Sequence, residues 1–192
     1  KQYIEMKNSD WLTNYDATNE TFWQNEGKKI AWKTLTITTI ALTMSFATWF
    51  LFSVVVIKLP KIGFKFSDNQ LFWLAAMPGL AGGLLRILNT FLIPMFGTKK
   101  VITVTTFLKI IPLFMLGFAV MDPNSSFGYF MLIAFLLGIG GGDFSSYMPS
   151  TSLFFPKKEL GTALGVQAGI GNFGVSLVQL LLRFWRRREK WN

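Results

Sequence analysis

The 192-residue sequence contains neither cysteine nor histidine. Disulfide bonds, metal sites built from Cys and His, and acid–base catalysis by histidine are therefore excluded for this chain. No nucleophile–base pair or metal cluster appears in the sequence, so we expect no enzyme, no metal and no other cofactor.

Charged residues are also scarce, at 15% of the sequence, whereas soluble domains contain about 25%. Hydrophobic residues make up 51% and include 20 Phe and 7 Trp. Most charges lie before residue 34, in short connections or in the last ten residues, so the stretches between them are nearly uncharged. This pattern predicts an all-α, polytopic membrane protein embedded in the lipid bilayer.

The net charge of +9 raises the question of a nucleic-acid partner. A basic, aromatic-rich chain can bind RNA when its aromatic residues are interleaved with Lys and Arg. Here the aromatic residues lie in apolar runs and the basic residues lie beside them, which is the usual signature of membrane topology. We therefore expect no nucleic-acid partner.

Five segments have the length and composition of membrane-spanning helices. Such a helix needs about 20 mostly apolar residues, and residues 35–57, 71–96, 101–120, 127–154 and 161–182 meet or approach this length. Short connections such as GTKK and MDPNSS carry turn signals. The chain thus divides into a polar N-terminal segment (1–32), a helical domain (33–182) and a basic tail (183–192).

Within the polar segment, Trp11, Phe22 and Trp23 suggest an amphipathic stretch at the membrane surface, where aromatic rings are favoured. A loosely ordered tail is the equally weighted alternative.

The positions of the lysines indicate the orientation of the chain. A cytoplasmic N-terminus places seven lysines inside and three outside: Lys28, Lys29, Lys33, Lys99, Lys100, Lys157 and Lys158 against Lys58, Lys61 and Lys65. We therefore predict a multi-pass protein of the inner (plasma) membrane with its N-terminus in the cytoplasm. Five helices then place the tail RFWRRREKWN outside, where its five positive charges are disfavoured, so we expect this tail to be non-native.

Arg86 lies about midway along the second span, after small residues that allow close helix contact. Charged residues within spans are costly and are candidates for function. The flat donor fork of arginine suits a planar oxyanion, so we favour anion binding. The alternatives are that Arg86 snorkels to the surface or neutralises a buried carboxylate.

Two further charges lie within spans: Lys109 in the third, and Asp143 after the run GIGGG in the fourth. The long stem of Lys109 can snorkel towards the cytoplasmic face, and we favour that structural role. Asp143 has three interpretations, since it can be protonated, pair with Arg86 or Lys109, or line a water-filled path. A charge or proton role for Lys109 and Asp143 stays open.

Glycines are dense in the fifth span. Three of them recur every four residues: Gly161, Gly165 and Gly169. They therefore share one helix face and permit close packing. Gly171 and Gly174 lie on other faces, around Asn172, where a small ligand can approach the backbone and an amide.

Residues 142–180, GDFSSYMPSTSLFFPKKELGTALGVQAGIGNFGVSLVQL, resemble the signature region of the nitrate/nitrite porters (NarK type) of the major facilitator superfamily. The likeness continues upstream through FWQNEGKKIAWKTL, SFATWFLFSVVVIKLPKIGFKFSDNQLFWL and GGLLRILNTFLIPMFGTKK. It covers roughly residues 11–180 in order and without large gaps, which makes it far more specific than the glycine spacing.

The resemblance implies a 12-helix transporter of two six-helix halves, with nitrate bound centrally between them. Arg86 then corresponds to the substrate arginine of the family's second helix, and Asn172 to the signature asparagine of the fifth. Phe46 and Phe144 match aromatic positions that line the anion site. The signature glycines, thought to let helices rock past one another, match Gly165, Gly169, Gly171 and Gly174.

Three departures from the family stand out. Asp143 occupies a position where family members commonly have Asn, which places a negative charge beside Phe144 unless Asp143 is protonated or paired. The loop motif after the second helix is reduced to FGTKK. The family's second substrate arginine lies on the eighth helix, which this chain does not contain.

The resemblance makes domain 33–182 helices 1–5 of an incomplete N-terminal half. We expect a truncated, inactive fragment of a porter that takes up nitrate, exports nitrite or exchanges them, with the missing C-terminal half as its partner. The alternatives are a non-transporting membrane remnant and a half-transporter that needs a partner chain.

Overall fold

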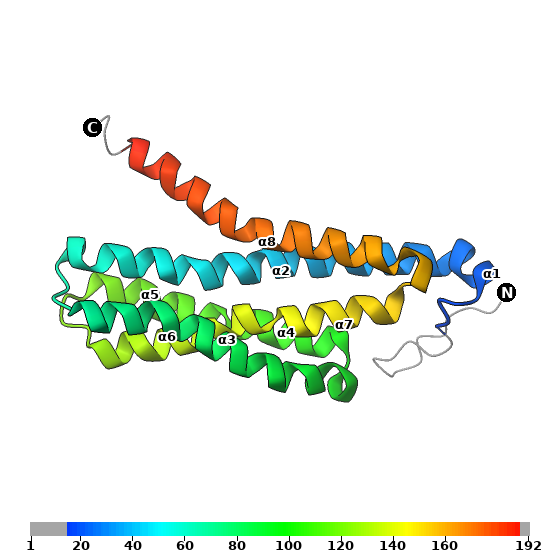
Figure 1. Ribbon diagram of the computed structural model, residues 1–192, viewed down its shortest axis with the longest axis horizontal. Helices are drawn as coiled ribbons and strands as arrows, with labels where there is room; N and C mark the ends of the chain where they lie inside the picture. Colours follow the sequence, from blue (N-terminus) through cyan, green and yellow to red (C-terminus); the bar gives the residue numbers. More distant parts are fainter. Residues whose placement is uncertain (1–14, 189–192) are drawn as a thin grey trace.

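The computed structural model describes the backbone of residues 15–188 and the side chains of residues 15–180. Its elements are α1 (Glu20–Phe22), a π-helical turn (Trp23–Gly27), α2 (Lys28–Lys58), a 3₁₀ turn (Leu59–Ile62), α3 (Asp68–Phe96), α4 (Thr98–Leu108), α5 (Ile110–Met121), α6 (Phe127–Gly142), α7 (Phe144–Phe154) and α8 (Lys157–Arg188). The described residues contain no strand, which confirms the predicted all-α class (Figure 1).

Five helical segments are long and apolar enough to cross a membrane, as predicted: 20–62, 68–96, 98–121, 127–154 and 157–180. The third segment consists of α4 and α5 in line, interrupted at Lys109, and the fourth of α6 and α7, interrupted at Asp143. Pro112 explains the first interruption, because it has no N–H to donate to the carbonyl of Leu108. The glycines at 140–142 loosen the helix just before the second.

Local signals in the sequence determine where the spans begin and turn. The Ser67 side chain accepts a hydrogen bond from the Gln70 N–H and the Gln70 side chain accepts one from the Ser67 N–H, a capping box that starts α3. Ser126 caps α6 in the same way with its hydroxyl. Gly63 and Gly97 adopt positive φ angles, which glycine tolerates, and so allow the turns before α3 and before α4.

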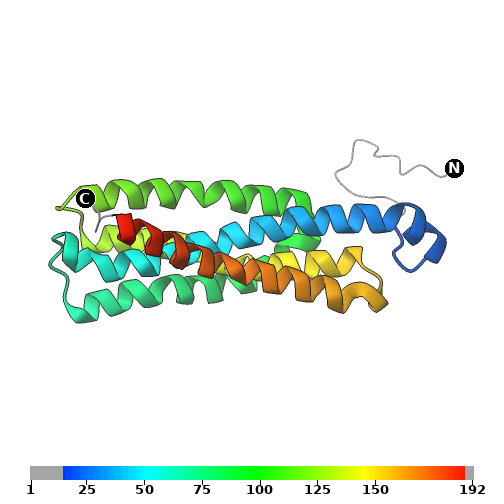
Figure 2. The same ribbon diagram turned by 90° about the horizontal axis from the view of Figure 1, so that it is seen from above.

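The spans run side by side along one long axis (Figures 1 and 2). Helix α3 packs against α6, and α2 packs against α8. The C-terminal part of α8 leaves the bundle (Figure 1). The start of α2, the α3–α4 connection and the α7–α8 connection lie at one end of the bundle, which we call the basic end because seven of the lysines named above gather there.

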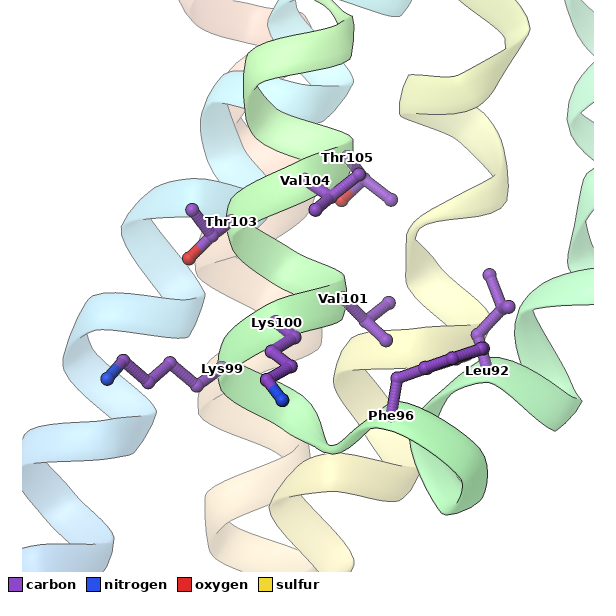
Figure 3. A pocket seen from close by; sticks show the side chains of 8 residues that line it. All are labelled: Leu92, Phe96, Lys99, Lys100, Val101, Thr103, Val104 and Thr105. Atoms are coloured by element: carbon purple, nitrogen blue, oxygen red, sulfur yellow. The ribbon is translucent and has the colours of Figure 1, made fainter. Parts of the chain in front are cut away.

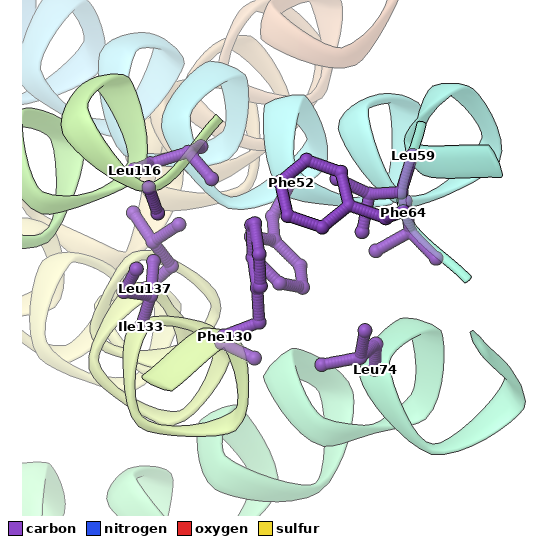
Figure 4. Close-up of a cluster of buried hydrophobic side chains, with 11 residues drawn as sticks. Phe52, Leu59, Phe64, Leu74, Leu116, Phe130, Ile133 and Leu137 are labelled. Atoms are coloured by element: carbon purple, nitrogen blue, oxygen red, sulfur yellow. The ribbon is translucent and has the colours of Figure 1, made fainter. Parts of the chain in front are cut away.

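A cluster of buried apolar side chains fills the opposite end, where α2 and α5 finish and α3 and α6 begin (Figure 4). Its members are Phe52, Val56, Leu59, Phe64, Leu74, Leu116, Ala119, Phe130, Ile133, Ala134 and Leu137. Large apolar side chains such as Ile57 and Phe91 are exposed on the outside, where the bilayer supplies an apolar solvent. Close packing, rather than exclusion from water, therefore holds the spans together.

Candidate functional site

Arg86 lies near the middle of the 29-residue α3, and its side chain is exposed. Its Nε–H donates a hydrogen bond of 3.2 Å to the carbonyl oxygen of Gly141. Its guanidinium carbon lies 5.7 Å from the centre of the Phe144 ring, a cation–π contact. Within the described residues Arg86 forms no ion pair with a carboxylate, so these two contacts fix the direction of its fork.

Aromatic rings continue from Phe144 across to α2. The ring centres of Phe144 and Phe46 are 6.1 Å apart, and those of Phe46 and Trp49 are 6.0 Å apart. The structure thus brings together three of the predicted site residues, namely Arg86, Phe144 and Phe46. Sequence reasoning missed Trp49, although its spacing of three residues from Phe46 places both on one face of α2.

The glycines of α8 divide into two groups. A methyl group at Gly174 would lie 2.1 Å from the Thr43 carbonyl oxygen, and one at Gly171 would lie 2.7 Å from the Leu42 side chain. These two glycines therefore let α8 approach α2 closely. The face formed by Gly161, Gly165 and Gly169 is exposed, and a methyl group there would meet nothing within 4 Å. Among the described residues, nothing uses the close packing that this face permits.

Asn172 lies between the two close glycines, and its side chain is exposed. Its amide nitrogen donates a hydrogen bond of 2.8 Å to the Ala168 carbonyl oxygen of the same helix. Because Gly171 contacts Leu42, one turn of α2 before Phe46, Asn172 lies at about the depth of the aromatic rings. No described hydrogen bond joins Asn172 to Arg86.

Lys109 and Asp143 form a buried ion pair between the two helix interruptions. The Lys109 ammonium donates hydrogen bonds to Asp143 Oδ2 and to Ser45 Oγ, and the Ser45 hydroxyl lies 2.8 Å from Asp143 Oδ2. The Lys109 side chain is 5% exposed, so the expectation that it snorkels to the cytoplasmic face is wrong. Of the interpretations of Asp143 left open above, the structure shows the pair with Lys109 and not one with Arg86.

A second buried polar chain joins α7, α8 and α2. The Thr151 hydroxyl donates to Gln167 Oε1 at 2.8 Å, and Gln167 Nε2 donates to the Thr38 hydroxyl at 2.9 Å. Sequence reasoning gave Gln167 no role, although a lone amide in an apolar helix is a signal for such a bond.

The segment that precedes α2 is docked at the basic end of the bundle, so its described residues do not form a loosely ordered tail. Its placement at the membrane surface stays a prediction. Trp23 is fully buried, and its indole N–H donates to Glu159 at 3.0 Å. The Tyr15 hydroxyl donates to the Phe154 carbonyl oxygen at 2.8 Å, and burial raises the pKa of Tyr15 to about 12. Glu20 accepts a hydrogen bond from Gln24 at 2.9 Å and pairs with Lys158 at 2.8 Å. Trp11 lies outside the described residues.

A cavity of about 540 Å³ lies at the basic end, between the end of α3 and α4 (Figure 3). Its lining residues are Leu92, Phe96, Lys99, Lys100, Val101, Thr103, Val104 and Thr105. Arg86, Phe144 and Phe46 are not among these lining residues, so the cavity does not include the candidate site.

Comparison with known proteins identifies the fold family. The sequence profile of the Major Facilitator Superfamily matches residues 37–184. A probable nitrate/nitrite antiporter, NarK2, of Thermus thermophilus is 55% identical over 178 residues, which are 93% of this chain and 40% of that protein. The nitrate/nitrite transporters NarU of Salmonella typhimurium and Escherichia coli are 46% and 45% identical over 92% and 91% of this chain, and 38% of each transporter is covered.

The chain spans about 40% of the length of these relatives and corresponds to their N-terminal part. The relatives are named as transporters or antiporters, not as enzymes. The resemblance drawn from the sequence is therefore confirmed, and the chain belongs to the Major Facilitator Superfamily.

Proposed function

We propose that this chain supplies one half of the anion pathway of a nitrate/nitrite transporter, with Arg86 as the residue that attracts the anion. The placement of Arg86 carries the proposal: it lies near the middle of the α3 span, exposed, and its guanidinium is held by one carbonyl and one aromatic ring. Only Nε is engaged in a described hydrogen bond, which leaves the terminal NH₂ groups for a ligand. A planar oxyanion such as nitrate can accept two parallel hydrogen bonds from such a fork.

Phe46, Phe144 and Asn172 complete this half of the proposed site. The two rings give the anion a flat, apolar wall and keep water away from the guanidinium, which strengthens its electrostatic attraction. The amide nitrogen of Asn172 carries two hydrogens and uses one within its own helix, so the second can orient the anion.

The glycines support the movement that transport needs. Alternating access is largely a rocking of one helical bundle against another around a fixed site. Gly171 and Gly174 give α8 a smooth contact with α2, along which the helices can shift. We assign the open face of Gly165 and Gly169 to packing against the remainder of the porter.

The proposed location is the plasma membrane, with the polar segment 1–32 in the cytoplasm. The support is the gathering of lysines at the basic end, because Lys and Arg are enriched in cytoplasmic loops.

The 192 residues alone are proposed not to transport, because alternating access needs two halves and the chain spans about 40% of its relatives. Activity then requires the C-terminal part of the porter, either in the same polypeptide or as a separate chain. Nitrate flux into vesicles that contain only this chain would overturn this proposal.

The direct test is a hybrid porter in which residues 1–180 are followed by the remainder of the Thermus thermophilus relative. We expect nitrate/nitrite exchange in proteoliposomes from the hybrid, and loss of at least about 100-fold in rate with Arg86→Ala, since a buried anion would lose its counter-charge. The intact relative is the control for assembly. An Arg86→Ala hybrid that transports like its parent would refute the assignment of Arg86.

A further inference from the structure

The only two charged side chains that are both buried and in the membrane interior, among the described residues, lie at the two places where a span is interrupted. Lys109 separates α4 from α5, and Asp143 separates α6 from α7. Their ion pair thus joins the third span to the fourth, and Ser45 adds the first span, α2. Three of the five spans meet at this contact.

The residues on either side of Asp143 are the ones that hold Arg86. Gly141 supplies the carbonyl that accepts from Nε, and Phe144 supplies the ring beneath the guanidinium. The Gly141 carbonyl oxygen and the Phe144 ring both contact Arg86 of α3. A methyl group at Gly141 would meet Trp49 of α2, and the Asp143 side chain contacts Ser45 of α2 and Lys109. Asp143 thus lies between the two residues that contact Arg86 and is itself held by α2 and by the third span.

A buried ion pair is a poor device for stability alone. Removing two charges from water carries a large penalty, and apolar residues of similar volume often give equal or greater stability. Asp143 Oδ1 has no hydrogen-bond partner among the described residues, so the carboxylate is only partly compensated. Such pairs are best attested where they specify one arrangement of packed helices.

We propose that Lys109 and Asp143 are positioning residues, whose ion pair sets the rotation of the α6–α7 span and thereby the orientation of the Arg86 guanidinium. The effect of the ion pair on the orientation of Arg86 is independent of transport. Only its effect on anion binding rests on the proposed function of Arg86.

The test uses the 192-residue chain in lipid bilayers, labelled with ¹⁵N at arginine. Solid-state NMR then observes the Arg86 Nε–H, which is assigned by its absence in Arg86→Lys, and Phe144→Leu gives the position of this signal without the ring beneath it. The decisive variant is the double substitution Lys109→Met with Asp143→Asn, which removes both buried charges and leaves no uncompensated ion. We expect this variant to stay folded even where either single substitution does not, because neither charge is left buried without its partner.

If the pair positions Arg86, the double variant is as stable as the parent but its Arg86 signal moves towards that of Phe144→Leu. In the hybrid porter the same variant raises the nitrate KM about tenfold with a smaller change in maximal rate, a coupling typical of residues in one network. The matched control removes the exposed pair, with Lys158→Met and Glu20→Gln, and leaves the Arg86 signal unchanged.

A double variant whose Arg86 signal matches that of the parent would overturn the proposal. The orientation of the guanidinium would then not depend on the ion pair. This NMR result does not depend on nitrate. A failed proposal here therefore leaves the proposed function standing, whereas transport by the Arg86→Ala hybrid would remove the proposed function and leave the positioning role intact.

Discussion

The described chain contains two lysine–carboxylate pairs, one in the membrane interior and one at the basic end. Lys109 and Asp143 are 5% and 0% exposed, whereas Lys158 and Glu20 are 55% and 63% exposed. At the surface, water solvates both partners whether or not they meet, so the pair contributes little. In the interior neither ion has another solvent, so each requires the other. The fold therefore requires the lysine–carboxylate pair in the membrane interior, whereas the pair at the basic end is dispensable.

The largest effect is expected when one partner of the interior pair is removed. Lys109→Met leaves the Asp143 carboxylate buried with only the Ser45 hydroxyl beside it. We expect the free energy of unfolding to fall by about 3–5 kcal/mol, the usual result of leaving one charge of a buried pair uncompensated. Thermal unfolding in detergent micelles, followed by circular dichroism, measures the loss.

The control is the double variant, in which Asp143→Asn is combined with Lys109→Met. We expect it to regain most of the stability that Lys109→Met alone loses. Additive losses in the double variant would contradict mutual dependence, since coupled residues give non-additive changes.

The next effect concerns packing in the same interior layer. Gly174→Ala places a methyl group 2.1 Å from the Thr43 carbonyl oxygen, so α8 must move away from α2. We expect a loss of about 1–3 kcal/mol, as for other insertions into a packed core. Gly165→Ala on the same helix meets nothing within 4 Å and is the matched control, with no loss expected. Equal effects of the two substitutions in the same unfolding assay would show that α8 does not pack through Gly174.

The spans were predictable from the sequence because hydrophobic length depends only on local composition. All five were found, and the interruption at Lys109 follows from Pro112, three residues later. The family was predictable because the match of residues 142–180 is long and collinear. The position of Arg86 near the middle of α3 followed from its place in the second span.

Pairings between spans were not predictable, because they depend on the rotation of each helix. Lys109 was expected to snorkel, since the sequence does not show that Asp143, 34 residues later, lies opposite it. The docking of Trp23 on the bundle was not predicted, since its partner Glu159 is 136 residues away. The spacing of the glycines at 161, 165 and 169 correctly identified one face of α8. It could not show whether another part of this chain covers that face.

At the basic end, Tyr15 gives a smaller, pH-dependent effect. Burial raises its pKa from 10.0 to about 12, so between these values the docked segment keeps a proton that the undocked segment releases. Docking is therefore fully favourable below pH of about 10 and weakens as the pH rises towards about 12. A nitroxide on Thr21→Cys, the only cysteine in the chain, should become more mobile over this range, as measured by electron paramagnetic resonance.

Tyr15→Phe removes the titrating group and should give a label mobility that does not change in the same range. A transition of equal size in this variant would assign the pH dependence to another group at the basic end.

The smallest effect is expected from the exposed pair. Lys158→Met leaves Glu20 in water and still hydrogen-bonded to Gln24, so neither the unfolding temperature nor the mobility of the Thr21→Cys label should change measurably. The docked segment is held by the buried Trp23 and by Tyr15, which this substitution does not touch. A loss of stability comparable to that of Lys109→Met would mean that the basic end is as poorly hydrated as the membrane interior, and the contrast between the two pairs would fail.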